Sequence, residues 1–251
     1  MTATALATHG LRKSFGALQV TQDVRFDLPA GARHALIGPN GAGKTTFINL
    51  LTGMLAPDGG RIELEGADIT SLPPQDRVKR GLARTYQINT LFPDLTPLEA
   101  VTLVVCERHG VSRRWYERLA KRHAVIDEAF ALLRDLGLGD LVRRPTRQLA
   151  YGHQRVLEIA LALATRPHVL LLDEPAAGVP AQESGILYEV ISALPAEIAV
   201  LFIEHDMDLV FRFASRITVL VGGRILREGP PGEIADDPEV RSVYLGTAVH
   251  G

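Results

Sequence analysis

The strongest local signal in this sequence is a glycine-rich turn, Gly38-Pro39-Asn40-Gly41-Ala42-Gly43-Lys44-Thr45, followed by Thr46. An apolar run, His34–Ile37, precedes it and predicts a buried strand, and a helix is expected to begin near Gly43. Glycines between a strand and a helix let successive backbone N–H groups surround phosphate oxygens. The turn therefore predicts a site for ATP, in which Lys44 reaches the outer phosphates and the Thr45 hydroxyl binds Mg²⁺. The alternative is a glycine-rich turn with a lysine by chance. Such a turn would not need a strand before it and a helix after it, and both are predicted here.

A second apolar run, Val169–Leu172, ends in two acids, Asp173 and Glu174. Four consecutive apolar residues are typical of a central strand in a parallel sheet, which is covered on both faces. Ligands bind at the carboxyl ends of such strands. We therefore expect Asp173 to hold Mg²⁺, directly or through water, and Glu174 to act as general base on the attacking water. The alternative is a strand that ends in solvated acids.

Two further polar residues follow predicted elements. His205 comes after another apolar strand, Ile198–Ile203, and Gln87 lies near the start of a helical region. Taken alone, a single histidine or glutamine is more often structural than functional, so neither residue defines a site without further information.

The remaining pattern predicts an α/β core that is interrupted by helices. Alternating apolar residues predict a half-buried strand at 20–28, and a strand is expected at 61–65 after a glycine turn. Thr96-Pro97-Leu98-Glu99 forms a capping box for a helix to about residue 107, and further helices are expected at 115–136 and 151–164. Strands and helices then alternate, with strands expected at 169–173, 198–203 and 217–221 and helices at about 181–194 and after His205. We expect one domain over 1–251, with a core at 1–87 and 165–251 and a helical subdomain at 88–164.

Composition narrows the function classes. The 251 residues are 46% hydrophobic and carry a net charge of −2, so the chain is globular and shows no overall positive charge for nucleic acid. The single cysteine, Cys106, cannot form an internal disulfide and is expected to be a small buried side chain. No signal peptide and no apolar run of the roughly 20 residues needed to span a bilayer are evident. A membrane role would therefore require other chains.

The segment Leu149-Ala150-Tyr151-Gly152-His153-Gln154-Arg155, together with the phosphate loop, resembles the signature of the ABC ATPase family. The resemblance covers essentially the whole chain and implies an ABC-type P-loop ATPase core with an antiparallel β subdomain and an inserted helical subdomain. It implies that Phe15 stacks on adenine and that His205 contacts the γ-phosphate. It also implies that Gln87 binds the metal and links the nucleotide site to a membrane partner. The signature residues of a second copy, Ala150 to His153, would close over each ATP.

Three later segments narrow the resemblance to the ATPases of branched-chain amino acid importers. These segments are Asp173-Glu174-Pro175-Ala176-Ala177-Gly178, Ile203-Glu204-His205-Asp206-Met207 and Tyr244-Leu245-Gly246. The branch implies two transmembrane permease subunits, a second ATPase subunit in a homodimer or heterodimer, and indirect action with an extracytoplasmic solute-binding protein. Nucleic acid is not an implied partner. The chain is then expected at the cytoplasmic face of the inner membrane.

The sequence departs from the family pattern at three positions. Ala150 stands where a serine is common, His153 replaces the usual glutamine, and Pro180 occupies a position that is usually Asp or Asn at the dimer seam. Communication between subunits is therefore in question at Pro180.

Other functions remain open at this stage. One alternative is an importer of urea, amides or other amino acids, and another is a lipid or lipopolysaccharide exporter. A soluble ABC ATPase acting on ribosomes or DNA usually has two cassettes or a long inserted coil, which this chain lacks. A regulator without turnover often lacks the base that Glu174 supplies here. A basic cluster between 108 and 122 is either a solvated helix face or a surface for lipid headgroups.

Overall fold

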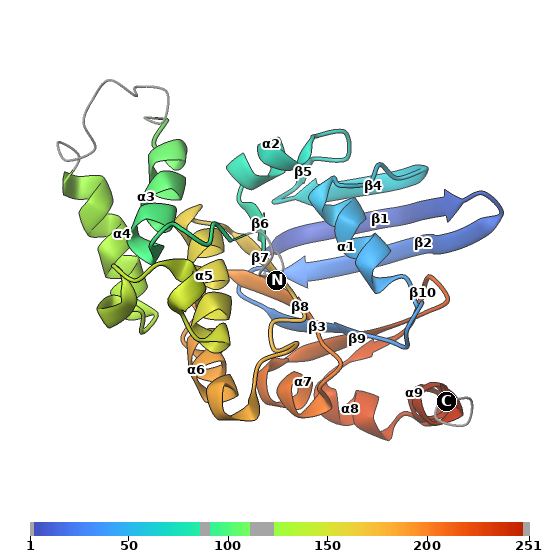
Figure 1. Cartoon of the computed structure of the whole chain (residues 1–251). Helices are drawn as coiled ribbons and strands as arrows, with labels where there is room; N and C mark the ends of the chain where they lie inside the picture. The colour runs from blue at the N-terminus through green and yellow to red at the C-terminus, as the bar shows by residue number, and fades with distance from the viewer. Residues whose placement is uncertain (1–2, 86–90, 111–122, 248–251) are drawn as a thin grey trace. The chain divides into compact units, whose positions relative to one another are not determined.

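The computed structural model describes residues 3–85, 91–110 and 123–247. The chain divides into two compact units. The first, here called the sheet unit, comprises Met1–Leu82, His168–Glu174 and Pro195–Gly251. The second, the helical unit, comprises Ala83–Pro167 and Pro175–Leu194. Each unit is described separately below (Figure 1).

A six-stranded sheet has the order β10-β9-β3-β8-β7-β6. Its central strands β3, β7, β8 and β9 are parallel, and β10 pairs antiparallel with β9. β8 is buried along its whole length, as the continuous apolar sequence predicts. The strands are β3 (Arg33–Ile37), β6 (Leu82–Arg84), β7 (Val169–Asp173), β8 (Ala199–Ile203), β9 (Arg216–Val221) and β10 (Arg224–Gly229).

A second, antiparallel sheet has the order β2-β1-β4-β5. Its strands are β1 (Thr4–Phe15), β2 (Leu18–Pro29), β4 (Gly59–Leu64) and β5 (Ala67–Asp68). Along β2, Val24, Phe26 and Leu28 are buried in alternation, whereas Thr21 is buried out of phase with them. The phase changes at an irregularity where Asp23 has a φ of 53°, because an extra residue on one strand shifts the alternation.

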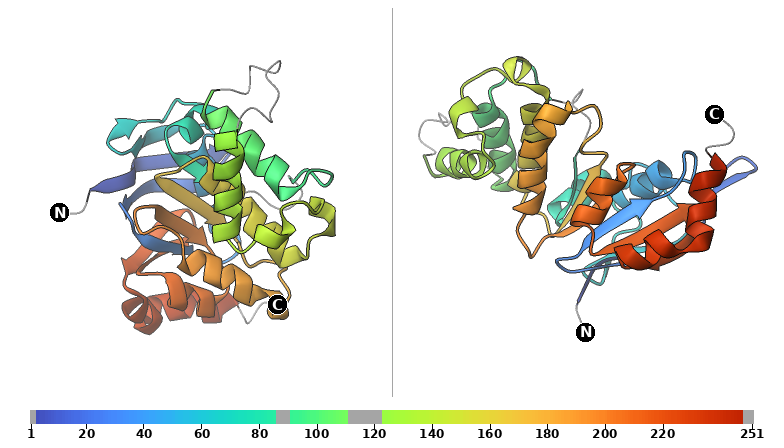
Figure 2. Two further views of the ribbon diagram at one scale, coloured as in Figure 1. Left: turned by 90° about the vertical axis from the view of Figure 1, so that its left-hand side faces the viewer. Right: turned by 90° about the horizontal axis from the view of Figure 1, so that it is seen from below.

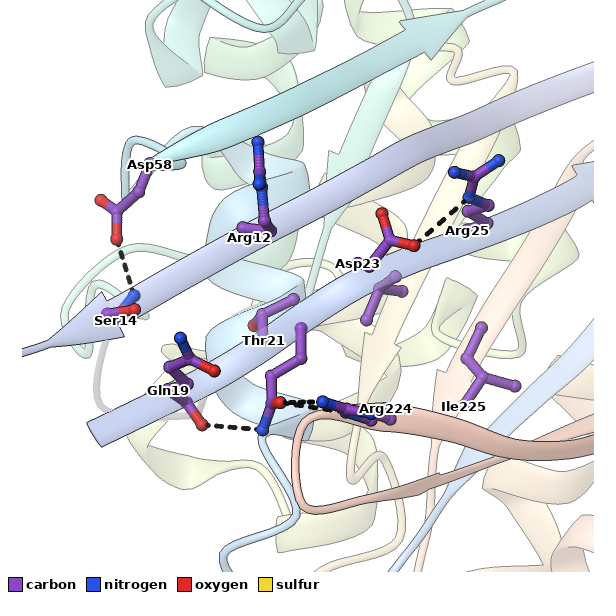
Figure 3. A pocket seen from close by; sticks show the side chains of 11 residues that line it. Arg12, Ser14, Gln19, Thr21, Asp23, Arg25, Asp58, Arg224 and Ile225 are labelled. Atoms are coloured by element: carbon purple, nitrogen blue, oxygen red, sulfur yellow. Dashed lines mark hydrogen bonds and ion pairs between the residues drawn. The ribbon is translucent and has the colours of Figure 1, made fainter. Parts of the chain in front are cut away.

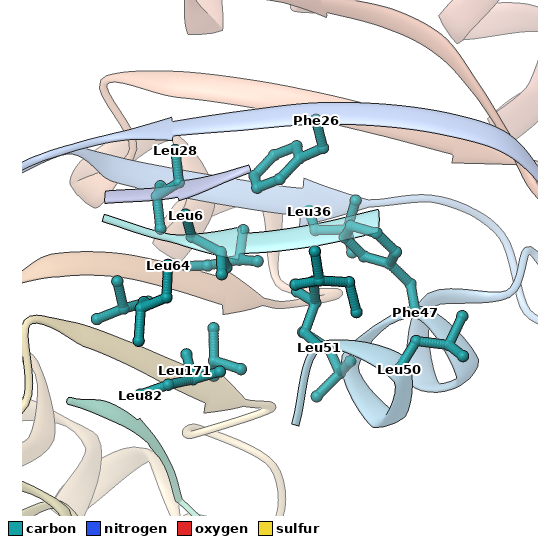
Figure 4. Close-up of a cluster of buried hydrophobic side chains, with 14 of the residues drawn as sticks. Leu6, Phe26, Leu28, Leu36, Phe47, Leu50, Leu51, Leu64, Leu82 and Leu171 are labelled. Atoms are coloured by element: carbon teal, nitrogen blue, oxygen red, sulfur yellow. The ribbon is translucent and has the colours of Figure 1, made fainter. Parts of the chain in front are cut away.

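The core of the sheet unit lies between the two sheets and α1 (Lys44–Thr52) (Figure 4). Phe47 of α1 packs edge-on against Phe26 of β2, with ring centroids 5.7 Å apart. This packing fixes the start of α1, and therefore the loop before it, against the antiparallel sheet. Among the described residues, four further helices belong to this unit: α2 (Pro74–Lys79), α7 (Met207–Phe213), α8 (Pro231–Asp236) and α9 (Pro238–Thr247).

The helical unit contains α3 (Pro97–Arg108), α4 (His123–Asp135), α5 (Tyr151–Ala164) and α6 (Ala181–Ser192), with two short 3₁₀ turns at Gly139–Leu141 and Thr146–Gln148. The first three pack against one another, and α5 also packs against α6 (Figure 2). The predicted capping box is present, since Thr96 Oγ1 accepts from the Glu99 N–H and the Glu99 carboxylate accepts from the Thr96 N–H. Cys106 is buried, as expected.

The structure bears out the predicted elements within a few residues, except that the first part of the predicted helix at 115–136 lies outside the described residues. The fold is confirmed as an α/β core with an antiparallel β sheet and inserted helices. In the basic cluster, Arg108 is a structural residue, because its guanidinium donates to Ala164 O at 2.7 Å and to Glu128. The cluster's other arginines and its lysine lie outside the described residues, whereas His109 lies 3.2 Å from Glu128 Oε2. No helix among the described residues is both long and apolar enough to cross a bilayer.

Candidate nucleotide site

The glycine-rich loop connects β3 to α1, as predicted. Gly38 has a φ of 154° and Gly43 a φ of 101°, and residues other than glycine rarely adopt these backbone angles. A Cβ atom on Gly38 would lie 2.1 Å from Leu220 O, and one on Gly43 would lie 2.6 Å from Val20 O. The loop therefore needs glycine both for its backbone angles and because neighbouring strands approach it closely.

A Gly38→Ala substitution is expected to reduce the free energy of unfolding by about 3 kcal/mol or more, since it adds a backbone clash to an unfavourable φ. The matched control is Gly41→Ala. Gly41 has a φ of 78°, but a Cβ atom there would meet nothing within 4 Å, so only the conformational cost of about 1–2 kcal/mol applies. Urea unfolding of both variants measures the difference. Equal losses would show that the close approach of Leu220 has no energetic role.

Lys44 lies at the first position of α1 and its side chain folds back over the loop. Its Nζ donates to Gly38 O at 2.6 Å and to Pro39 O at 3.1 Å. Burial lowers the pKa of Lys44, while the carboxylates of Glu174 and Asp173 act in the opposite direction. The ammonium is therefore held at the loop, within range of electrostatic attraction to both carboxylates.

The loop borders a pocket of about 240 Å³. The pocket is lined by residues 40–46 of the loop and α1, by Val20 of β2, and by Glu174 and His205. The structure thus brings together the loop and two side chains that lie more than 130 positions farther along the sequence. Backbone N–H groups at a helix start next to a buried ammonium form a binding site for phosphates.

Glu174 and His205 face each other at the edge of this pocket. Glu174 Oε1 lies 3.1 Å from His205 Nε2, and both side chains are partly exposed. Glu174 directly follows β7 and has a φ of 48°, while its N–H donates to Ile203 O at 3.0 Å. A non-glycine residue in the left-handed region is conformationally unfavourable, and such residues cluster at functional sites. At this position the Glu174 side chain lines the pocket.

Three further residues were predicted to belong to this site: Asp173, Phe15 and Gln87. Asp173 is the last residue of β7, next to Glu174. Phe15 ends β1, is 49% exposed, and does not line the pocket, and Lys13 Nζ lies 5.8 Å from the centre of its ring. Gln87 lies outside the described residues.

The signature segment opens α5 in the helical unit. Ala150 is the N-cap residue and provides no side-chain cap, which is consistent with the missing serine hydroxyl. The Gly152 N–H donates to Glu183 Oε2 of α6 at 2.6 Å, so a carboxylate compensates for part of the uncapped helix start. Tyr151 and His153 occupy the first turn, and both are partly exposed. Sequence reasoning missed Glu183, because nothing in the sequence links it to a residue 31 positions earlier.

A buried ion pair lies farther along α5. Arg155 Nη1 donates to Glu158 Oε2 at 3.0 Å, and Arg155 Nη2 donates to Ala177 O at 3.1 Å. Burial raises the pKa of Glu158 to about 7, although Arg155 opposes this shift. The pair was not predicted, but its spacing of three residues on a helix is a signal that could have found it.

The raised pKa of Glu158 predicts a pH dependence of stability. Below the ordinary pKa of 4.5 the carboxyl is protonated in both states; as pH rises from there to about 7, only the unfolded state releases the proton, so stability falls. Between pH 5 and pH 8 we expect the free energy of unfolding of the native protein to fall by about 2 kcal/mol more than that of the Glu158→Gln variant. The glutamine of this variant cannot titrate. Urea unfolding at both pH values measures this loss. An identical pH dependence in the two proteins would contradict a raised pKa.

The loop, its lysine and the two facing side chains place the chain in the class of P-loop nucleotide-binding proteins. Comparison with known proteins narrows the class. The profile of the ABC transporter family matches residues 21–177, and a profile described as branched-chain amino acid ATP-binding cassette transporter matches residues 224–250. The chain belongs to the ABC transporter ATP-binding family, and it binds and hydrolyses ATP.

Curated relatives match over nearly their whole length. The chain is 39% identical to the high-affinity branched-chain amino acid transport ATP-binding protein BraF of Pseudomonas aeruginosa, over 99% of this chain and 100% of that protein. It is 38% identical to LivG of Escherichia coli, which has the same descriptive name, with the same coverage.

Solved structures of ATP-binding cassettes also match the fold. An ATP-binding cassette of an ABC transporter in its ADP conformation is 30% identical, with a TM-score of 0.85 over 98% of this chain and 100% of that chain. A nucleotide-free ATP-binding cassette is also 30% identical, with a TM-score of 0.84 over 96% of this chain and 98% of that one.

Proposed function

We propose that this chain is the ATPase subunit of an importer for branched-chain amino acids. The observation that carries the proposal is the match of residues 224–250 to the branched-chain amino acid cassette profile, supported by relatives that bear this function in their names. The chain would act at the cytoplasmic face of the membrane through two permease subunits, together with a second ATPase subunit. A solute-binding protein outside the membrane would deliver the cargo.

Binding of ATP would begin at the phosphate loop. Lys44 now donates to the carbonyls of Gly38 and Pro39, and these bonds would be exchanged for bonds to the outer phosphates. The loop N–H groups from Gly38 to Thr46 would surround the phosphate oxygens. Phe15, exposed at the end of β1, would provide a flat apolar surface for adenine.

Hydrolysis would depend on Glu174 and His205. The Glu174 carboxylate would accept a proton from the attacking water, and the water is thereby made a better nucleophile. His205, 3.1 Å from this carboxylate, would orient it and donate to the γ-phosphate. The strained backbone at Glu174 supports this assignment because it fixes the carboxylate at the edge of the phosphate pocket.

The residues also fit Mg²⁺. No cluster of three or more acidic, histidine or cysteine side chains that could hold a metal occurs among the described residues. Mg²⁺ commonly uses one or two protein oxygens together with substrate phosphates and water. Thr45 and Asp173 would supply the protein oxygens, and Gln87 is the third proposed ligand. When bound, the ion would neutralise charge on the phosphates.

The proposal includes closure of two ATPase subunits over each nucleotide. Residues Ala150 to His153 of one copy would face the γ-phosphate on the other copy, where the N-terminus of α5 favours an anion. At this helix start the Gly152 N–H already donates to the Glu183 carboxylate. Closure would therefore place the γ-phosphate beside a second anion. Gln87 would transmit closure to the membrane subunits.

The proposal is tested by reconstituting the chain in liposomes with the proposed permease subunits, second ATPase subunit and solute-binding protein. Leucine-loaded binding protein is expected to stimulate ATP hydrolysis several-fold over the unloaded protein. Stimulation by urea or by a lipid substrate, with no response to leucine, would overturn the cargo and favour an amide importer or a lipid exporter.

A further inference from the structure

One concave surface of the sheet unit is separate from the nucleotide pocket. It has a volume of about 760 Å³, which is in the range of small-molecule sites. It lies along β1 and β2 and is closed on one side by β10 (Figure 3). We call it the arginine pocket, because its lining includes Arg12, Arg25 and Arg224.

The charges around the arginine pocket do not cancel. Asp58 is bound to Lys13 Nζ at 2.8 Å and to the Ser14 N–H at 2.7 Å. Asp23 lies 3.6 Å from Arg25, so these two charges offset each other. Arg12 and Arg224 have no carboxylate partner among the described residues. The pocket therefore presents two uncompensated guanidinium groups.

One of these two groups is held in place by a neutral side chain. Arg224 donates through Nε and Nη2 to Gln22 Oε1, at 2.9 Å and 2.7 Å, which leaves its remaining donors available. Thr21, which also lines the pocket, is 3% exposed and its hydroxyl has no hydrogen-bond partner in the described part of the chain. Donors fixed before a ligand arrives favour binding because less freedom is lost on association.

Hydrogen bonds connect this pocket to the phosphate loop. The Gln22 N–H donates to Gly223 O at 2.8 Å, and the Gly223 N–H donates to Ala42 O at 2.9 Å. The Gln22 side chain also donates to Gly222 O at 3.0 Å. Gln22 thus contacts Arg224 in the pocket and also the Gly222-Gly223 turn, which is hydrogen-bonded to the phosphate loop. A ligand that moves Arg224 would change contacts of the phosphate loop.

We propose that the arginine pocket binds a small organic anion carrying phosphate or carboxylate groups, and that this binding alters nucleotide affinity at the phosphate loop. Guanidinium groups bind both kinds of anion through paired hydrogen bonds. The pocket is concave and small, which favours a metabolite over a macromolecular surface.

The test is calorimetric titration of the full chain saturated with Mg-ADP, so that the phosphate loop is already filled. Glucose 6-phosphate and succinate are the two probes, and their separate titrations distinguish a phosphate from a carboxylate ligand. Arg12→Ala is expected to weaken binding of the preferred probe by about 10-fold or more, the usual effect of losing one charged hydrogen bond. The matched control is Arg61→Ala, an exposed arginine on β4 outside the pocket, which should bind normally.

Coupling is tested in the same samples. By linkage, the bound probe should change the affinity for ADP, by about 5-fold or more if the coupling is of typical size. This change should be absent in Arg12→Ala at the same probe concentration. Failure of both probes to bind, or equal binding to the Arg12→Ala variant, would overturn the site. Binding without any effect on ADP affinity would overturn the coupling.

Discussion

A Glu174→Gln variant is expected to hydrolyse ATP at least about 100-fold more slowly than the native protein, the usual contribution of a general base. Glutamine keeps the shape of the side chain but cannot accept a proton from water. ATP binding should persist because Glu174 borders the phosphate pocket without replacing the donors of the loop. Slow turnover with retained binding should also trap the closed dimer that we propose. Steady-state phosphate release and gel filtration with Mg-ATP measure these two effects.

The matched control for this experiment is Glu233→Gln, an exposed carboxylate on α8 that does not line the nucleotide pocket. It should hydrolyse ATP at the native rate. Native turnover by Glu174→Gln would remove Glu174 from the reaction, and it would leave the short contact with His205 as a structural feature only.

A Lys44→Ala variant should lose ATP affinity by about 100-fold, because charged hydrogen bonds to the outer phosphates disappear together. Turnover falls as a consequence of lost binding, in contrast to Glu174→Gln. Equilibrium dialysis with labelled ATP measures the affinity directly.

The control for Lys44 is Lys79→Ala, an exposed lysine of α2 in the same unit. Its ATP affinity should equal that of the native protein. Native affinity in Lys44→Ala, with the fold verified by circular dichroism, would show that the bonds to Gly38 O and Pro39 O are the only role of this lysine.

Some elements were predictable because their signals are local. The apolar run Val169–Leu172 predicts a buried strand by composition alone, and β7 has those bounds plus Asp173. The capping box at Thr96 and Glu99 likewise fixes the start of α3 within four residues of sequence. Local signals of this kind do not depend on the rest of the fold.

Other elements were missed because their sequence pattern is broken. β1 contains four consecutive buried residues, Ala5 to Thr8, and then an irregular stretch, so it shows no regular alternation. β1 is an inner strand of its sheet, between β2 and β4, and register shifts near Gly10 disturb its period. β10, α8 and α9 are short elements without strong periodicity, and they were not predicted either.

The candidate site was predicted in composition but not in geometry. The sequence indicated the loop, Glu174 and His205, whereas the 3.1 Å contact between the last two depends on the pairing of β7 with β8. The contacts of Glu183 with Gly152 and of Gln22 with Arg224 are long-range, so no sequence window contains both partners. The roles assigned to the site residues and the domain boundaries at 87/88 and 164/165 remain predictions.

Uptake of labelled leucine by cells shows whether ATP hydrolysis by this chain drives leucine import. Cells that lack the native gene would carry either the unmodified gene or Glu174→Gln, with expression of both proteins verified. We expect leucine uptake with the unmodified gene and its loss with Glu174→Gln. Equal uptake in the two strains would contradict the claim that ATP hydrolysis by this chain drives leucine import.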